Sequence, residues 1–130
     1  MPILLDTTAL IDVLRGRPET AARLLALRST GEAPWICAIS VEEIWRGLRP
    51  NEQDAAAGLL DASRMAPLGS AEGKRAGSWR RDFAERGVTL AQPDCLIAAA
   101  AVSVGARLAT GNPKDFPMGE LEVEHWPVGA

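Results

Sequence analysis

Four acidic residues of this 130-residue sequence stand where apolar segments end and more polar ones begin. Carboxylate oxygens are the ligands that Mg²⁺ and Mn²⁺ prefer, and an all-oxygen set favours these ions over zinc. A divalent cation held in this way can orient a phosphodiester and help turn water into hydroxide. The pattern therefore predicts metal-assisted hydrolysis of a phosphodiester. The four acids are Asp6, Glu43, Asp94 and Asp115.

Each acid, taken singly, also has a purely structural explanation. Ser40 and Glu43 match the capping box S-x-x-E, in which the glutamate accepts from the serine backbone N–H. Asp94 suits the first turn of a helix, and residues 112–115 match an N-cap, a proline and a first-turn acid. Asp6 is harder to explain, because it follows three apolar residues and an unpaired carboxylate there is costly. A non-catalytic α/β binding module whose acids only cap helices stays an alternative.

The four acids together favour a cation more strongly than any one of them does. Carboxylates brought to one edge of a sheet repel each other and raise one another's pKa values unless positive charge neutralises them. We therefore expect a divalent cation at this edge.

The elements that position these acids follow from apolar periodicity. Short continuous apolar runs alternate with stretches of helical spacing, which predicts an α/β fold: a three-layer α/β/α sandwich around a parallel central sheet of about five strands. Ligands bind such sheets at the carboxyl ends of the strands. We expect one domain over residues 1–130. Strands are predicted at 3–5, 35–39, 65–68, 107–110 and 121–126, and helices at 9–14, 18–31, 40–48, 51–63, 70–86 and 94–105.

Composition excludes several classes of protein. The longest uncharged apolar stretch, Leu96–Val102, is far shorter than the roughly 20 residues that cross a bilayer. The first residues lack the cationic segment of a secretory signal, so we expect a cytoplasmic protein without membrane contact. Net charge is −3, which counts against passive nucleic-acid binding but not against an enzyme that acts on it. Cys37 and Cys95 are too few for a disulfide framework, and we expect both to be buried thiols.

Four motifs in sequence order resemble those of the PIN-domain ribonucleases, and within that family the VapC toxins of prokaryotic toxin–antitoxin pairs. Leu5 to Ile11 is similar to the family's opening L-D-T-S-x-L-I, and Ser40-x-x-Glu43 with Gly47 to its S/T-x-x-E-x-x-x-G. Residues 94–99 resemble D-x-x-I-A-A, and residues 110–116 resemble T-x-N-x-x-D-F. The resemblance covers essentially the whole chain.

The resemblance implies endonucleolytic cleavage of RNA that depends on Mg²⁺ or Mn²⁺. It also implies a homodimer and a VapB-like antitoxin partner that blocks the acidic site. By the same resemblance, Asp6 and Asp94 are the principal metal ligands, and Glu43 and Asp115 complete the site directly or through water. The residues that would support the pocket are Thr7, Thr110 and Asn112.

Basic residues that could hold RNA lie on or beside two predicted helices, although a solvated helix face is the simpler explanation for any one of them. Gly111 stands where the family often has a basic residue, so one phosphate contact is expected to be missing. Glu42 and Glu43 lie about 100° apart around a helix, and we expect only Glu43 to face the site. The candidate RNA contacts are Arg46, Arg49, Arg80 and Arg81.

Two further enzymatic interpretations remain. A housekeeping PIN nuclease of RNA processing would share the site but would be harmless when expressed without a partner. A phosphatase with an aspartyl nucleophile is disfavoured, because Thr8 replaces the second acid of the usual D-x-D.

Overall fold

The computed structural model describes residues 1–129 and shows a sheet of five parallel strands in the order β3-β2-β1-β4-β5. The strands are β1 (Ile3–Leu5), β2 (Trp35–Ile36), β3 (Arg64–Met65), β4 (Arg107–Thr110) and β5 (Val123–His125). The helices are α1 (Thr7–Leu14), α2 (Pro18–Ser29), α3 (Ala38–Arg46), α4 (Gln53–Asp61), α5 (Ser70–Glu85), α6 (Gln92–Ser103) and the short 3-10 helix η1 (Pro113–Asp115).

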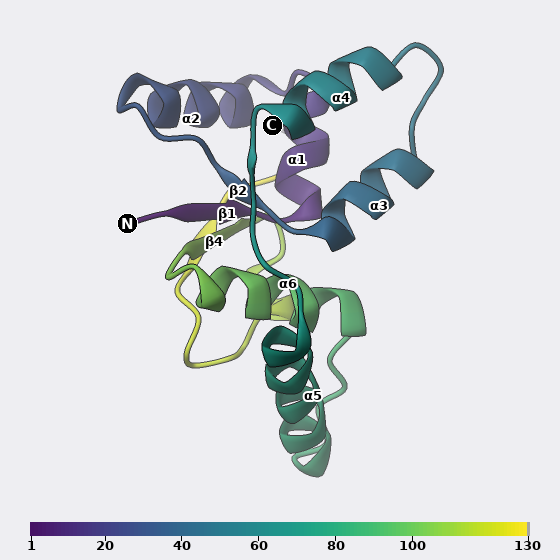
Figure 1. Ribbon diagram of the computed structural model, residues 1–130, viewed down its shortest axis with the longest axis vertical. Coiled ribbons are helices and arrows are strands. Elements are labelled where there is room, and N and C mark those ends of the chain that lie inside the picture. Colours follow the sequence, from purple (N-terminus) through teal and green to yellow (C-terminus); the bar gives the residue numbers. More distant parts are fainter. Residues whose placement is uncertain (130) are drawn as a thin grey trace.

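Helices cover both faces of the sheet, which confirms the predicted three-layer architecture. Helices α1 to α4 lie on one face, and α5 and α6 lie on the other (Figure 1). The central strand β1 shows why both faces must be covered. Ile3 and Leu5 pack into the cluster under α1 to α4, whereas Leu4 packs into the cluster under α6. Alternate side chains of a strand point to opposite faces, so a strand apolar at every position needs a helical layer on each side.

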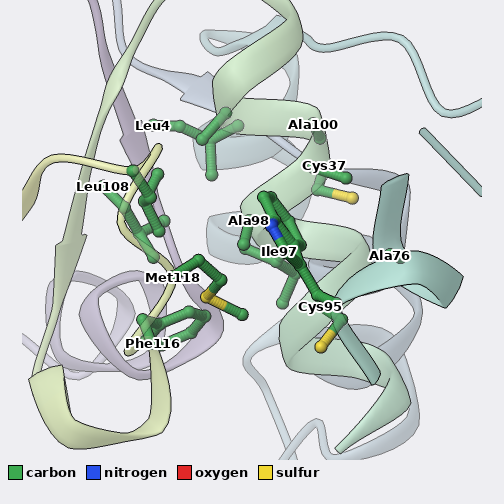
Figure 2. Packing of buried hydrophobic residues seen from close by; sticks show 14 of the residues in the cluster. Leu4, Cys37, Ala76, Cys95, Ile97, Ala98, Ala100, Leu108, Phe116 and Met118 are labelled. Carbon is green, nitrogen blue, oxygen red and sulfur yellow. The ribbon is translucent and has the colours of Figure 1, made fainter. Parts of the chain in front are cut away.

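Helix α6 forms the centre of the second layer. Its alanines Ala98, Ala99, Ala100 and Ala101 are fully buried between the sheet and α5. Small side chains let the helix lie close to the sheet, and larger ones, including Ile97, Leu108 and Phe116, fill the remaining space (Figure 2). This close packing holds the first turn of α6, which carries Asp94, near the carboxyl edge of the strands.

Strands 3–5 and 107–110 have the predicted bounds, and the other expected elements begin or end at different residues from those observed. The strand predicted at 35–39 ends at Ile36, because Cys37 is the extended N-cap of α3 and the helix begins at Ala38. The capping box at Ser40 is therefore wrong, since Ser40 already lies inside the helix. The strand predicted at 65–68 is β3, which pairs Arg64 and Met65 with β2 at the edge of the sheet. None of the helices formed by residues 1–129 is both long enough and apolar enough to cross a membrane.

Replacing Leu108 with alanine tests the importance of the buried sheet. Leu108 is fully buried in β4, so Leu108→Ala should lower the free energy of unfolding by about 2–5 kcal/mol through lost burial and a residual cavity. Leu25→Ala on α2 is the matched control, because Leu25 is 66% exposed and should change stability by less than about 0.5 kcal/mol. Urea denaturation measures both, and equal losses would contradict this assignment of the core.

Candidate active site

Asp6 lies between the end of β1 and the start of α1, and its carboxylate is almost completely buried. It is the N-cap of α1: Oδ1 accepts from the Ala9 backbone N–H at 3.0 Å and from the Thr8 hydroxyl at 2.6 Å. Oδ2 accepts from the Thr110 hydroxyl at 2.5 Å. Burial raises the pKa of Asp6, and the hydrogen bonds from Thr110, Thr8 and the backbone oppose that rise because they stabilise the charged form.

Parallel pairing of β1 with β4 brings Asp6 and Thr110 together. Leu5 is in register with Ala109, and the Asp6 N–H donates to the Ala109 carbonyl at 3.0 Å. The next residue of each strand therefore lies at the same edge. Thr110 then continues the network, because its hydroxyl accepts from the Asn112 N–H at 3.0 Å. Hydrogen bonds thus link the Asp6 carboxylate to both segments that follow the strands at this edge, the start of α1 and the loop after β4.

Glu43 reaches the same edge from α3. Its Oε1 accepts from the Thr7 hydroxyl at 2.7 Å, and the Thr7 and Ser40 hydroxyls are 2.9 Å apart. Glu42 instead pairs with Arg46 one turn further along the exposed side of the helix, at 2.9 Å. This arrangement agrees with the expectation that only one of the two adjacent glutamates faces the site.

Asp94 comes from the opposite helical layer, in the first turn of α6, and it is half-buried. Its pKa is raised to about 6, first by burial and then by repulsion from Asp115, Asp6 and Glu43. Asp94 therefore lies within electrostatic range of the other three acids, which come from three other segments of the chain. Within residues 1–129, no lysine or arginine forms an ion pair with any of them.

The donor chemistry of this site suits a hard divalent cation. All four groups are carboxylates, and no lysine or arginine of residues 1–129 forms an ion pair with them. Their spacing is open: the described chain contains no group of three or more acidic, histidine or cysteine side chains close enough to enclose a metal together. Mg²⁺ usually keeps several waters and binds few carboxylates directly, so an open acidic site fits it better than a closed cage would.

Helix-terminus explanations hold for three of the four acids. Asp6 caps α1, Asp94 lies in the first turn of α6, and Asp115 lies in the first turn of η1. Glu43 is the exception, because it bonds Thr7 rather than the Ser40 backbone. These local roles do not by themselves require the acids to lie close together, whereas Asp115, Asp6 and Glu43 all contribute to the raised pKa of Asp94.

Two hydroxyls that support the site, those of Thr8 and Ser40, were not predicted from the sequence. Thr8 donates to Asp6 and accepts from the Gly111 N–H at 3.0 Å, so it bridges α1 and the loop after β4. Ser40 supports Thr7. The motif contained a signal for Thr8, because Thr8 aligns with the serine of L-D-T-S-x-L-I and keeps its hydroxyl. The candidate RNA contacts Arg46, Arg49, Arg80 and Arg81 are all exposed, and Arg80 also donates its Nε to the Leu90 carbonyl at 3.2 Å.

Comparison with known proteins identifies the family. Residues 3–117 match the PIN domain. The chain therefore belongs to the PIN-domain family, and the resemblance found in its motifs is confirmed.

Its curated relatives include VapC ribonucleases. Ribonuclease VapC19 of Mycobacterium tuberculosis is 31% identical over 115 residues, which cover 88% of this chain and 92% of the relative. Ribonuclease VapC10 of the same organism is 33% identical over 118 residues, which cover 91% of this chain and 88% of the relative.

Solved structures confirm the fold. The VapBC2 structure from Rickettsia felis, bound to a promoter DNA fragment, superposes with a TM-score of 0.81 at 21% identity and covers 97% of this chain and 99% of that chain. FitAcB from Neisseria gonorrhoeae superposes with a TM-score of 0.78 at 24% identity, covering 96% of this chain and 97% of that chain.

The raised pKa of Asp94 predicts a specific pH dependence of stability. Between pH 4 and 6 the folded state holds a proton on Asp94 that the unfolded chain, with its ordinary value of 3.8, has lost. Stability of the wild type should therefore fall as pH rises through this window. Asp94→Asn removes the effect, so its stability relative to wild type should increase by about 1–2 kcal/mol from pH 4 to pH 7, after allowance for solvent screening.

Urea denaturation at several pH values in the presence of a chelator measures this difference. Asp54→Asn is the matched control, since Asp54 is also a first-turn acid, on α4, but is exposed and outside the site. A pH-independent gap between Asp94→Asn and wild type would contradict the proposed electrostatic environment.

Proposed function

We propose that this chain is an endoribonuclease that acts as the toxin of a VapBC-type toxin–antitoxin pair and hydrolyses RNA phosphodiesters at its four-acid site. The observation that carries the proposal is the convergence of four acids at the carboxyl edge of a PIN-domain sheet, where none of them forms an ion pair with a lysine or arginine of residues 1–129: Asp6, Glu43, Asp94 and Asp115. The VapC ribonucleases that match most of the chain support the activity and the substrate.

The chain's own residues prepare the site for Mg²⁺ or Mn²⁺, as in PIN-domain ribonucleases generally. Asp6 and Asp94 would hold the ion, with Glu43 and Asp115 acting directly or through water. Bound there, the ion supplies Lewis acidity toward the phosphate oxygens and lowers the pKa of water. Thr8 and Thr110 orient Asp6, and Thr7 orients Glu43, so the carboxylates keep their positions despite mutual repulsion. Thr110 and Asn112 shape the pocket.

The partner in this proposal is a VapB-like antitoxin. The solved structures that share the fold include VapBC complexes. The proposal places the toxin in the cytoplasm as one PIN domain and as a homodimer. An apolar groove lined by Ala38, Val41, Trp45 and Met65 offers the second copy a surface to pack against.

Removing the charge of one proposed ligand should abolish cleavage without unfolding the protein. Residues that only orient a metal ligand typically contribute 10–100-fold, so Asp94→Asn or Asp6→Asn should lower the cleavage rate by roughly 100-fold or more. Cleavage of total RNA by purified protein with Mg²⁺ or Mn²⁺ measures this, and a chelator should stop the wild type. Asp54→Asn should cleave normally. Full activity of either site variant would refute the assigned roles.

The four candidate arginines should contribute to RNA affinity through phosphate charge. Replacing any one of these arginines with glutamine should reduce the slope of log affinity against log salt by about 0.7, the value for one phosphate of a single strand. The four variants are Arg46→Gln, Arg49→Gln, Arg80→Gln and Arg81→Gln. Binding is measured in the Asp94→Asn background, so that the RNA stays intact. Arg28→Gln, an exposed arginine on α2, is the control. A variant whose slope equals that of the control does not contact phosphate.

A further inference from the structure

The C-terminal tail, Trp126–Gly129, lies against the loop that follows β4. The contact is closest at Gly111, where an added Cβ would overlap Val128 Cγ1 and would lie 3.2 Å from both Val128 Cβ and Cγ2. The tail therefore occupies the space that a side chain at position 111 would need. A basic residue, which the resembled family often has at this position, would not fit beside Val128 unless the tail moved.

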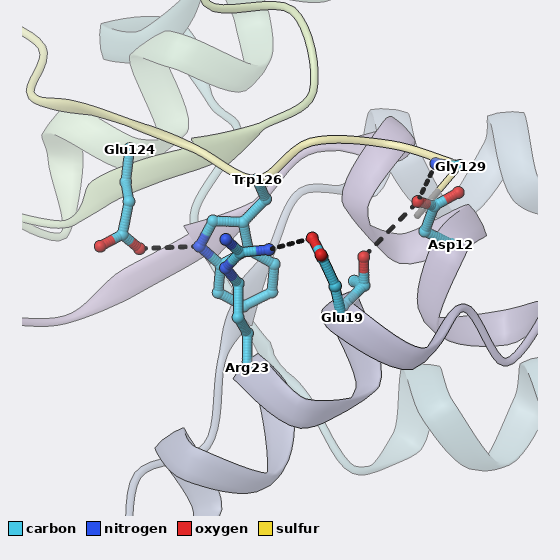
Figure 3. A network of polar contacts seen from close by, with 7 residues as sticks. Asp12, Glu19, Arg23, Glu124, Trp126 and Gly129 are labelled. Carbon is cyan, nitrogen blue, oxygen red and sulfur yellow. Dashed lines mark hydrogen bonds and ion pairs between the residues drawn. The ribbon is translucent and has the colours of Figure 1, made fainter.

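Hydrogen bonds fix the tail at both ends. Trp126 is buried, its backbone N–H donates to the Thr110 carbonyl at 2.8 Å, and its indole Nε1 donates to Glu124 at 2.8 Å. At the other end the Gly129 N–H donates to Asp12 Oδ2 on α1 at 2.8 Å (Figure 3). The four residues thus span from the end of β4 to the middle of α1.

The surroundings of Asp12 explain why the hydrogen bond from the Gly129 N–H is stabilising. Its side chain is buried, and within residues 1–129 no arginine or lysine forms an ion pair with it. Its other side-chain contact is the Thr20 hydroxyl, at 3.5 Å. A buried carboxylate without a hydrogen-bond donor is strongly unfavourable, so the Gly129 N–H contributes to the stability of both the tail and α1.

Val128 is fixed close to the proposed catalytic acids. The Gly111 N–H donates to Thr8, and Thr8 donates to Asp6, so the residue that Val128 covers is two hydrogen bonds from the buried carboxylate. The valine side chain is nevertheless 45% exposed. It presents an apolar surface to solvent beside a site that is otherwise made of carboxylates and hydroxyls.

We propose that Val128 forms part of the rim of the RNA cleft and packs against the nucleobase next to the scissile phosphate, so that the C-terminal tail contributes to base preference. This inference rests on the proposed ribonuclease activity. A nucleobase has a broad apolar face that an exposed valine can cover, whereas a phosphate would gain nothing from it. The tail thus replaces a charge contact at position 111 with an apolar one.

The test compares Val128→Ala with wild type on short RNAs that differ only in the bases flanking the cleaved bond. A partly exposed apolar contact should contribute modestly, so Val128→Ala should lower kcat/KM for the preferred RNA about 3–10-fold, mainly through a higher KM. The differences in kcat/KM between RNAs with different flanking bases should also become smaller. Leu25→Ala, an exposed apolar residue on α2, should change neither. A chain ending at Pro127 should reproduce the loss of preference.

The outcomes separate this inference from the activity on which it rests. No cleavage by wild type overturns both. Cleavage by wild type, absent in Asp94→Asn, with an unchanged base profile in Val128→Ala overturns the role of Val128 alone. A loss that is equal for all RNAs also overturns it, because a merely structural role would act in that way.

A second measurement tests the contact without activity. Gly111→Ala should lower the melting temperature, and the loss should be smaller in the Val128→Ala background, where the overlapping Cγ1 is gone. Strictly additive effects of the two substitutions on the melting temperature would show that the tail does not contact Gly111, and this result would refute the proposal.

Discussion

The buried carboxylate of Asp6 is the interaction on which the site depends. It ends the central strand, caps the helix that follows, and accepts from hydroxyls on two different segments. Without these donors, a charge at 4% exposure would be too costly to keep at the end of a strand. The same bonds connect α1 to the loop after β4, so one carboxylate orders two segments beside the acids. The helix cap and the proposed metal ligand are therefore the same group.

The site concentrates negative charge at the expense of stability. Asp94 approaches from the layer opposite α1 and α3, and its raised pKa reports both partial burial and the three acids that face it. The extensive packing of α6 against the sheet and α5 keeps Asp94 in position despite this repulsion. A bound divalent cation would relieve it, and this links the proposed activity to the stability of the fold.

Position 111 shows how a segment far away in the sequence can occupy the space beside a glycine. Gly111 has no side chain, and Val128 of the C-terminal tail fills the space that one would need. The tail can do this because β5 runs parallel to β4 and delivers Trp126 next to Thr110. From the sequence motif, the only expected consequence of Gly111 was the loss of a basic side chain.

The sequence by itself determined the α/β class, the parallel sheet and the four acids, because apolar runs of strand length and helical spacing are local patterns. Strand 107–110 was predicted with its observed bounds, whereas the second strand was predicted too long, since an apolar run continues into a buried helix without a change in pattern. Only the tertiary structure decided that Glu43 bonds Thr7, that Thr8 bridges two segments, and that the tail covers Gly111. These contacts join residues far apart in the chain, and their partners are selected by strand register and layer packing, which no local spacing encodes.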